Sequence, residues 1–235
     1  DRKFKMSLIN IALDGPAGSG KSTVGKIVSL RLSYDYLDTG MIYRGIAWWL
    51  SAMGWEESID ITGLISNLEI ISWIEPGFCR IIINGIEPPS DKLYSREISD
   101  LSSKISVYSE IRDIVNKVTR ILAEGKGTVV EGRDIGSVVL PQAEVKIFLT
   151  ASNEELARRR YMDFQKMGET VSYETVLAEI VGRNIRDSNR EIAPLKMASD
   201  AIHIDSTNLK IQEVVDKILT IVNDRLSRCF TGLPG

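Results

Sequence analysis

The stretch that organises this chain is Ile9-Asn10-Ile11-Ala12-Leu13-Asp14-Gly15-Pro16-Ala17-Gly18-Ser19-Gly20-Lys21-Ser22-Thr23. It combines an apolar strand, a G-x-x-x-x-G-K-[ST] loop and the start of a helix-like run. Glycines lack a Cβ atom, so the loop can turn successive N–H groups onto phosphate oxygens at the positive end of the following helix. The pattern predicts a site for the phosphates of a nucleoside triphosphate, formed by Gly15, Pro16, Ala17, Gly18, Ser19, Gly20, Lys21, Ser22 and Thr23.

Two side chains of this loop carry specific expectations. Lys21 is expected to reach the β- and γ-phosphates from an exposed position that adds little packing, and the Ser22 hydroxyl is expected to ligate Mg²⁺. Asp14, at the end of the strand, has two interpretations that the sequence leaves open. It either holds a Mg²⁺-bound water or shapes the loop.

Composition excludes several classes of protein. The chain has 235 residues, of which 43% are hydrophobic and 26% charged, which suits one α/β domain with inserts or two small domains. A net charge of −3 argues against a general nucleic-acid or membrane-surface binder. No apolar run reaches transmembrane length, and no signal-peptide core is seen. Cys79 and Cys229 lack metal-ligand spacing, so we expect reduced thiols and a cytoplasmic protein.

Strand and helix patterns alternate after the loop. Helical spacing continues to Leu32, and further helical patterns cover about 104–124, 153–167, 172–189 and 208–227. Apolar runs at 127–131, 145–149 and 201–205 are typical of buried parallel strands. This order predicts a parallel sheet wound by helices on both faces, with functional residues at the carboxyl ends of the strands. The only histidine, His203, is expected in the core.

One stretch departs from this alternation. Residues 68–75 and 78–84 are β-rich and are joined by Pro76-Gly77, which predicts an antiparallel hairpin. We therefore interpret about 45–102 as a small inserted subdomain.

A guanine-nucleotide switch is the alternative that two partial motifs suggest. Asp60-Ile61-Thr62-Gly63 fits D-x-x-G, and Asn116-Lys117-Val118-Thr119 half fits N-K-x-D. The first does not follow a strand, and the second carries Thr119 where guanine recognition needs a carboxylate.

Arginines favour phosphoryl transfer instead. This reaction needs in-line positioning and fixed cations, and it needs little proton chemistry. Guanidinium groups match phosphate oxygens bidentately, so arginines converging from distant segments suit a site that grips two phosphorylated ligands. Arg183 and Asp187 could also form only an i,i+4 ion pair. The candidates are Arg44, Arg112, Arg133, the run Arg158-Arg159-Arg160, and Arg183, Arg186 and Arg190.

Four blocks of sequence resemble the bacterial cytidylate kinases, a family of P-loop nucleoside monophosphate kinases. Besides the loop they are Leu37-Asp38-Thr39-Gly40-Met41-Ile42-Tyr43-Arg44, Glu131-Gly132-Arg133-Asp134-Ile135-Gly136, and Arg183-Asn184-Ile185-Arg186-Asp187-Ser188-Asn189-Arg190 followed by Ala193-Pro194-Leu195. The similarity runs from about Ser7 to Leu226.

The resemblance implies a three-part, monomeric enzyme. It implies a P-loop core at 7–44, 103–157 and 176–228, a monophosphate-binding insert at 45–102 and a helical lid at 158–175, with extensions at 1–6 and 229–235. The implied reaction moves the γ-phosphate of ATP to CMP or dCMP with Mg²⁺. The alternatives are a kinase for UMP or another small acceptor and, less favoured, a P-loop switch. The implied partners are small molecules, with no nucleic acid or membrane.

The resemblance also implies roles for single residues. Thr39, Arg44, Arg133 and Arg190 would grip the acceptor phosphate, and Arg183 and Asp187 would contact its ribose or phosphate. Ser103, Arg112 and Asp134 would read cytosine, and Arg159 and Arg160 would swing with the lid onto the transferring phosphate. The implied catalytic set is Lys21, Arg133, Arg159, Arg160, Arg183 and Arg190.

Overall fold

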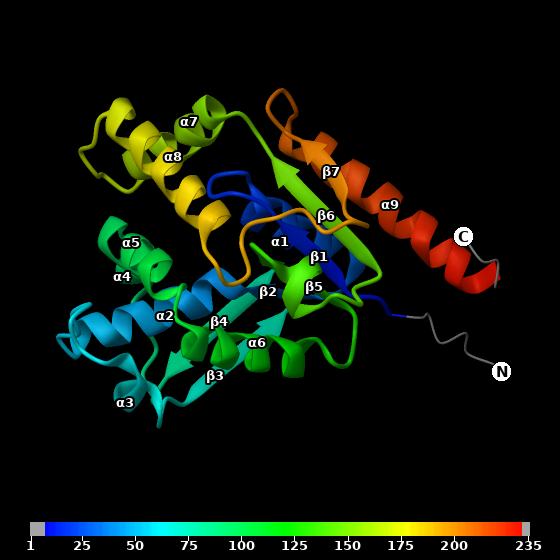
Figure 1. Ribbon diagram of the computed structural model, residues 1–235. Coiled ribbons are helices and arrows are strands. Elements are labelled where there is room, and N and C mark those ends of the chain that lie inside the picture. Colours follow the sequence, from blue (N-terminus) through cyan, green and yellow to red (C-terminus); the bar gives the residue numbers. More distant parts are fainter. Residues whose placement is uncertain (1–7, 232–235) are drawn as a thin grey trace.

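A five-stranded parallel sheet forms the centre of the molecule (Figure 1). This computed structural model describes residues 8–231, with side chains to residue 228. The strand order is β2 (Asp35–Asp38), β5 (Thr128–Gly132), β1 (Ile11–Asp14), β6 (Val145–Thr150) and β7 (Ile202–Asp205). Four of the five strands are largely buried on both faces, which explains the apolar runs in β1, β5 and β6. The predicted fold class is confirmed.

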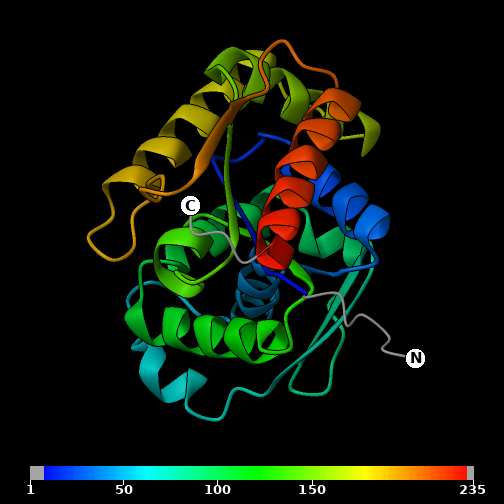
Figure 2. The ribbon, with the colours of Figure 1, turned by 90° about the vertical axis from the view of Figure 1, so that its right-hand side faces the viewer.

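One face of the sheet is covered by the first and last helices. Successive side chains of a strand point to opposite faces, and Ile11 and Leu13 of β1 point to this one. They pack with apolar residues of α1 (Lys21–Leu32) and α9 (Ile211–Thr231). Figure 2 shows α9 running beside α1.

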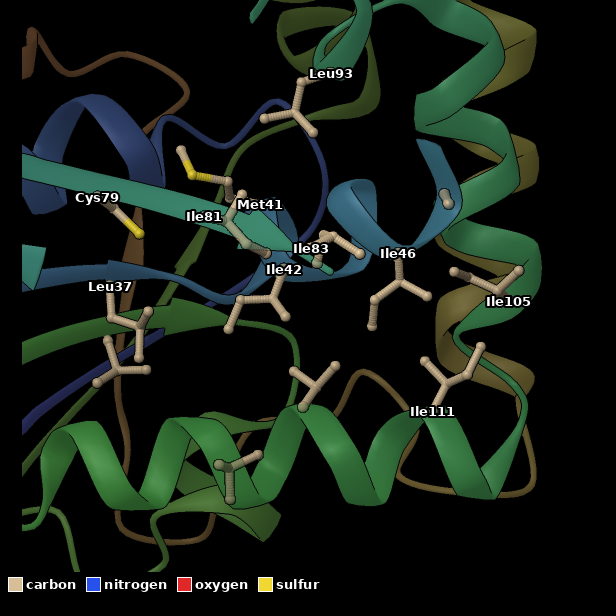
Figure 3. Close-up of a cluster of buried hydrophobic side chains, with 14 of the residues drawn as sticks. Leu37, Met41, Ile42, Ile46, Cys79, Ile81, Ile83, Leu93, Ile105 and Ile111 are labelled. Carbon is tan, nitrogen blue, oxygen red and sulfur yellow. The ribbon is translucent and has the colours of Figure 1, made fainter. Parts of the chain in front are cut away.

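The opposite face carries the segment that the sequence analysis interprets as an insert. Ala12 of β1 points to this side, where α2 (Thr39–Ala52), α5 (Arg96–Ile105), the π-helical turn η1 (Ile135–Val139) and α6 (Ser109–Ala123) contribute buried side chains. Figure 3 shows the resulting cluster, in which isoleucines of α2, α5, α6 and the hairpin meet. The insert therefore shares one continuous core with the sheet, and residue 45 lies inside α2 rather than at a linker.

The predicted hairpin is confirmed. Strands β3 (Ile70–Glu75) and β4 (Phe78–Ile83) pair antiparallel around Gly77, whose φ of 73° suits a residue without a Cβ atom. The Gly77 N–H donates to Ser29 Oγ of α1 at 2.9 Å, which fixes the hairpin tip on the core. Two short helices, α3 (Ile61–Ile65) and α4 (Ser90–Leu93), flank the hairpin in sequence.

Two helices form a separate lobe with a small core of its own. Helices α7 (Asn153–Lys166) and α8 (Tyr173–Asn189) pack through Leu156, Phe164 and Val176 among others. Gly168, with φ of 76°, lies in the turn between them. The predicted lid boundaries, 158 and 175, fall inside these helices, so the extent of a moving lid stays a prediction.

One local prediction is wrong in its start and another is wrong. The helix expected over about 104–124 is observed as α6, but it begins at Ser109, because residues 104 and 105 belong to the end of α5. The Ser106 hydroxyl donates to the Ser103 carbonyl at 2.7 Å, a local bond that competes with a continuous helix. His203 is exposed and lies 2.7 Å from Thr150 Oγ1, because β7 is the outer strand of the sheet and buries only Ile204.

The ends of the chain bear on the predicted extensions. Residues 1–6 and 232–235 lie outside the described residues, and the backbone of 229–231 continues α9. Within 8–231, none of the helices combines the length and the apolar character needed to cross a bilayer.

The Cys79 thiol allows a prediction on reactivity. Cys79 is a free, buried cysteine of β4, and burial raises the pKa of its thiol to about 11. In a Cys229→Ser background, we expect Cys79 to react with a disulfide reagent at pH 8 about a hundredfold more slowly than an ordinary thiol. The rate should rise about tenfold per pH unit from pH 8 to 10, as thiolate accumulates. A rate that levels off at pH 9 would contradict the raised pKa.

Candidate active site

A cavity of about 880 Å³ opens at the carboxyl ends of the central strands. It lies between the phosphate-binding loop (residues 15–23), the segments after β2 and β5, helix α5 and the lobe of α7 and α8. Of the candidate residues named from the sequence, all but Asp14, Gly15, Pro16 and Arg186 line this one cavity. The convergence of distant segments at one edge of the sheet was expected, and it is observed.

The phosphate-binding loop approaches its neighbours too closely for side chains at two glycines. A Cβ atom on Gly15 would lie 2.0 Å from the Leu149 carbonyl oxygen, and one on Gly18 would lie 2.9 Å from that of Leu156. Gly18 and Gly20 also have φ values of 79° and 92°. The loop conformation therefore requires glycine at these positions, and the backbone of β6 and α7 supports it from behind.

Lys21 is buried, which corrects the expectation of an exposed side chain. Its ammonium group donates to the Pro16 carbonyl at 2.7 Å and to Ser19 Oγ at 3.2 Å, so it lies across the loop. Burial, and then the charge of Arg133, lower the pKa of Lys21. A triphosphate bound here would bring negative charge next to this ammonium group and so favour its charged form.

Glu131 also lines the cavity, although the sequence predicts no role for it beyond its place at the start of the block 131–136. It lies on β5, and its Oε1 accepts a 2.7 Å hydrogen bond from Ser22 Oγ. Its Oε2 is buried with no hydrogen-bond partner among the described residues, and burial raises the pKa of the carboxyl. A carboxylate near the end of an otherwise apolar strand is the sequence signal that marks it.

Asp14 has a structural role, although not for the loop that follows it. Its two oxygens accept hydrogen bonds from the N–H groups of Ile135 and Gly136 at 2.8 and 2.7 Å, so it shapes the segment after β5. Burial raises the pKa of Asp14 to about 6. Its other interpretation, a hold on a Mg²⁺-bound water, stays a prediction.

The far end of the cavity contains arginines arranged around two buried carboxylates. Asp187 accepts a 2.9 Å hydrogen bond from Arg133 Nε and lies 4.0 Å from Arg183 Nε. Asp134 pairs with Arg112 and lies 3.6 Å from Arg190 Nη2. Two negative charges thus face four positive ones.

The excess of positive charge in this cluster affects the pKa of its arginines. Burial, and then the charge of Arg133, lower the pKa of Arg183, whose Nε is buried with no hydrogen-bond partner within the described chain. Arg190 Nη2 is likewise buried with no hydrogen-bond partner among the described residues, although it lies 3.6 Å from Asp134. Such a cluster is suited to bind an anion.

Three further candidates line the same cavity. Arg44 donates to Asp38 Oδ2 at 2.7 Å and stacks 4.5 Å from the centre of the Tyr94 ring. Thr39 Oγ1 donates to the Glu131 carbonyl at 2.7 Å. Ser103 Oγ is buried without a partner in the part of the chain that the structure describes, which leaves it available to a ligand.

The arginines of α7 differ in their surroundings. Arg158 is exposed and forms a double hydrogen bond with Glu155. Arg160 stacks 4.3 Å from the Phe164 ring and donates to Ser99 Oγ of α5 at 3.4 Å. Arg159 is held by several hydrogen bonds to the core.

The guanine-nucleotide alternative has no support in this geometry. Asp60 caps α3 by accepting from the Thr62 N–H, and Asn116 is buried within α6. Neither lines the cavity that the described residues form.

A parallel sheet with a phosphate-binding loop and a second, arginine-rich anion site defines a P-loop phosphotransferase of small molecules. Comparison with known proteins narrows this class. The family described as Cytidylate kinase matches residues 11–224. The chain is 43% identical over 217 residues to a cytidylate kinase of Geobacter sulfurreducens, covering 92% of this chain and 93% of that protein. It is also 43% identical over 223 residues to one of Bacillus subtilis, covering 92% and 97%.

The chain belongs to the cytidylate kinase family. It is an enzyme, a phosphotransferase, as the resemblance implied.

Proposed function

We propose that this protein transfers the γ-phosphate of ATP to the phosphate of CMP or dCMP, giving ADP and the pyrimidine nucleoside diphosphate. An oxygen of the acceptor phosphate attacks the γ-phosphorus, and the bond from that phosphorus to the β,γ-bridging oxygen breaks. The observation that carries the proposal is that the phosphate-binding loop and the arginine cluster share one cavity. Family membership adds independent support, and it does not favour a kinase for another acceptor.

The donor end fits a triphosphate with Mg²⁺. Mg²⁺ prefers oxygen ligands and is held in kinase sites by one or two protein groups together with substrate phosphates. Ser22 Oγ and the buried, half-paired carboxylate of Glu131 offer such oxygens side by side. When bound there, the ion would neutralise charge on the β- and γ-phosphates. Lys21 and the loop N–H groups would bind the same phosphates.

The acceptor end fits a pyrimidine monophosphate. We assign its phosphate to Thr39, Arg44, Arg133 and Arg190, and its ribose or phosphate to Arg183 and Asp187, because these groups line the arginine-rich end of the cavity. The positive charges of these arginines would also stabilise the negative charge of the phosphoryl group during its transfer.

Recognition of cytosine is assigned to Ser103, Arg112 and Asp134, which are all buried at this end. Cytosine offers an exocyclic amine donor and the N3 acceptor, whereas uracil has a carbonyl and an N–H in these places. Asp134 can accept from the amine, and Arg112 can donate to N3. Uracil would leave these buried groups mismatched.

Closure of the α7 and α8 lobe would exclude water, a competing acceptor for the γ-phosphate. Arg160 is assigned to contact the transferring phosphate in the closed state. The expectations of a monomeric, cytoplasmic enzyme stay predictions, and the free thiol of Cys79 agrees with a reducing compartment.

A coupled assay of ADP formation tests the function. With Mg²⁺ and ATP, we expect rapid turnover of CMP or dCMP and much slower turnover of UMP and AMP. Equal rates with all four acceptors would remove the base-recognition assignment and leave the kinase activity intact. No turnover with CMP or dCMP would contradict the proposed function.

Asp134→Asn tests base recognition more directly. We expect the CMP to UMP ratio of kcat/KM to fall at least about tenfold, because an amide can donate to the uracil carbonyl. Thermal stability should also fall, since Arg112 and Arg190 lose their buried counter-charge. Asp187→Asn is the matched control, because it alters the other buried carboxylate and should slow both acceptors alike. An unchanged ratio in Asp134→Asn would mean that the base is read elsewhere.

A further inference from the structure

Arg159 joins three separate segments of the chain. Its Nε donates to Glu155 Oε1 at 2.7 Å, one turn earlier on α7. Its Nη1 donates to the Ser19 carbonyl at 3.2 Å and to Ser206 Oγ at 3.0 Å, and its Nη2 donates to the Ser206 carbonyl at 2.7 Å. The guanidinium group therefore bridges helix α7, the phosphate-binding loop and the segment after β7.

The bond to Ser19 fixes the orientation of a peptide group. In a trans peptide the C=O of one residue and the N–H of the next point in opposite directions. The Ser19 carbonyl is turned toward Arg159, so the Gly20 N–H is turned away from it. Gly20 can hold this position because its φ is 92°, and a Cβ atom there would lie 3.8 Å from Arg159 Nη1.

The other end of the bridge is anchored to the sheet. The N–H and the hydroxyl of Ser206 both donate to the Thr150 carbonyl at the end of β6, at 2.8 and 2.9 Å. Thr207 Oγ1 accepts from the Ser152 N–H at the start of α7, at 2.9 Å. Ser206 is thus a rigid support, and the first turn of α7 is tied to the core at two points.

Glu155 completes the arrangement. Its carboxylate accepts from Arg159 and forms the double hydrogen bond with Arg158, and these arginines lower its pKa to about 2. It therefore carries its charge at every pH at which the protein works, and it holds the Arg159 side chain in one direction.

We propose that Arg159 is a positioning residue that orients the Ser19–Gly20 peptide, so that the Gly20 N–H faces the donor phosphates before ATP binds. This proposal rests on the proposed function for the nature of the donor. It replaces the sequence-based role of Arg159 as a swinging lid residue, because both terminal nitrogens of its guanidinium donate to Ser19 or Ser206 in the core, while its Nε is held by Glu155 on the same helix. Motion of the lobe would then begin after Arg159.

Two variants separate this role from simple electrostatics. Glu155→Gln removes a negative charge near the loop, so electrostatics alone predicts tighter binding of an anion. Loss of the bridge predicts weaker binding. Arg159→Lys keeps the positive charge, but one ammonium cannot make the same set of bonds to Ser19 and Ser206.

The experiment is a titration of each variant with inorganic tripolyphosphate by calorimetry. We expect Glu155→Gln and Arg159→Lys to bind about tenfold more weakly than the native protein. In ¹⁵N-glycine spectra of the free protein, the Gly20 amide signal should shift or broaden in both variants. Arg120→Met is the matched control, since Arg120 also donates to backbone carbonyls, those of Val138 and Val139, which do not line the cavity. It should bind tripolyphosphate as the native protein does.

Kinetics distinguish the remaining outcomes. The proposal predicts a raised KM for ATP with kcat nearly unchanged at saturating ATP, and Ser206→Ala should behave in the same way. The proposal would be overturned if Glu155→Gln and Arg159→Lys bound tripolyphosphate as tightly as the native protein or more tightly. A large fall in kcat with an unchanged KM for ATP would overturn it as well. Binding of tripolyphosphate needs no acceptor, so its outcome stands apart from whether CMP is phosphorylated.

Discussion

We expect Lys21→Met to lower kcat/KM for ATP by roughly a thousandfold. The ammonium group lies across the phosphate-binding loop, within reach of the Pro16 carbonyl and Ser19 Oγ, and it is the loop's own positive side chain. A triphosphate would replace these neutral partners, and the interaction would strengthen as charge moves during transfer. Methionine keeps the length of the side chain and removes the charge.

The fold should survive this change. Burial disfavours the charged form of Lys21, so an uncharged side chain of similar length removes an electrostatic cost while two hydrogen bonds are lost. Thermal unfolding should show a melting temperature within a few degrees of the native value. Lys26→Met is the control on the same helix, because Lys26 is exposed and lies outside the lining of the cavity. Turnover of Lys21→Met within threefold of the native rate would exclude the assigned role.

Local patterns were sufficient to predict the sheet and the phosphate-binding loop. The apolar runs that become β5 and β6 are long enough to need burial on both faces, and the glycine spacing of the loop has a direct conformational cause. The hairpin followed from two β-rich runs around Pro76-Gly77. In each case the signal lies within one short stretch of the sequence, although the strand pairs of the sheet join distant segments.

Features set by distant contacts were not predictable in this way. Ser22 meets Glu131 across 109 positions, and Arg159 meets Ser19 across 140. Neither contact leaves a periodic signal in the sequence. His203 was assigned to the core because its strand is apolar, yet the strand order places it at the edge of the sheet. Burial of Lys21 likewise depends on how the loop folds over its own side chain.

Arg183→Met should reduce turnover at least about a hundredfold while raising the melting temperature of the free protein. Burial is the largest cause that lowers the pKa of Arg183, and the charge of the neighbouring Arg133 is the next. Asp187 is its nearest counter-charge, but Arg133 already makes the shorter contact with that carboxylate. Without a bound anion, the Arg183 charge therefore opposes folding, and its value lies in binding the acceptor and the transferring phosphate.

The coupled assay measures the fall in turnover, and melting curves with and without CMP measure the change in stability. A gain of about 1 kcal/mol would raise the melting temperature of a protein of this size by about 2 to 4 °C. The further stabilisation that CMP gives the native protein should shrink in the variant, because one of the groups that binds it is gone. Arg186→Met, on the same helix, is the control, since Arg186 is exposed, pairs with Asp100 and lies outside the main cavity. If Arg183→Met instead melts at a lower temperature and keeps its turnover, then Arg183 and Asp187 form only the i,i+4 ion pair that the sequence left open, and the acceptor phosphate is held by the other arginines of the cluster.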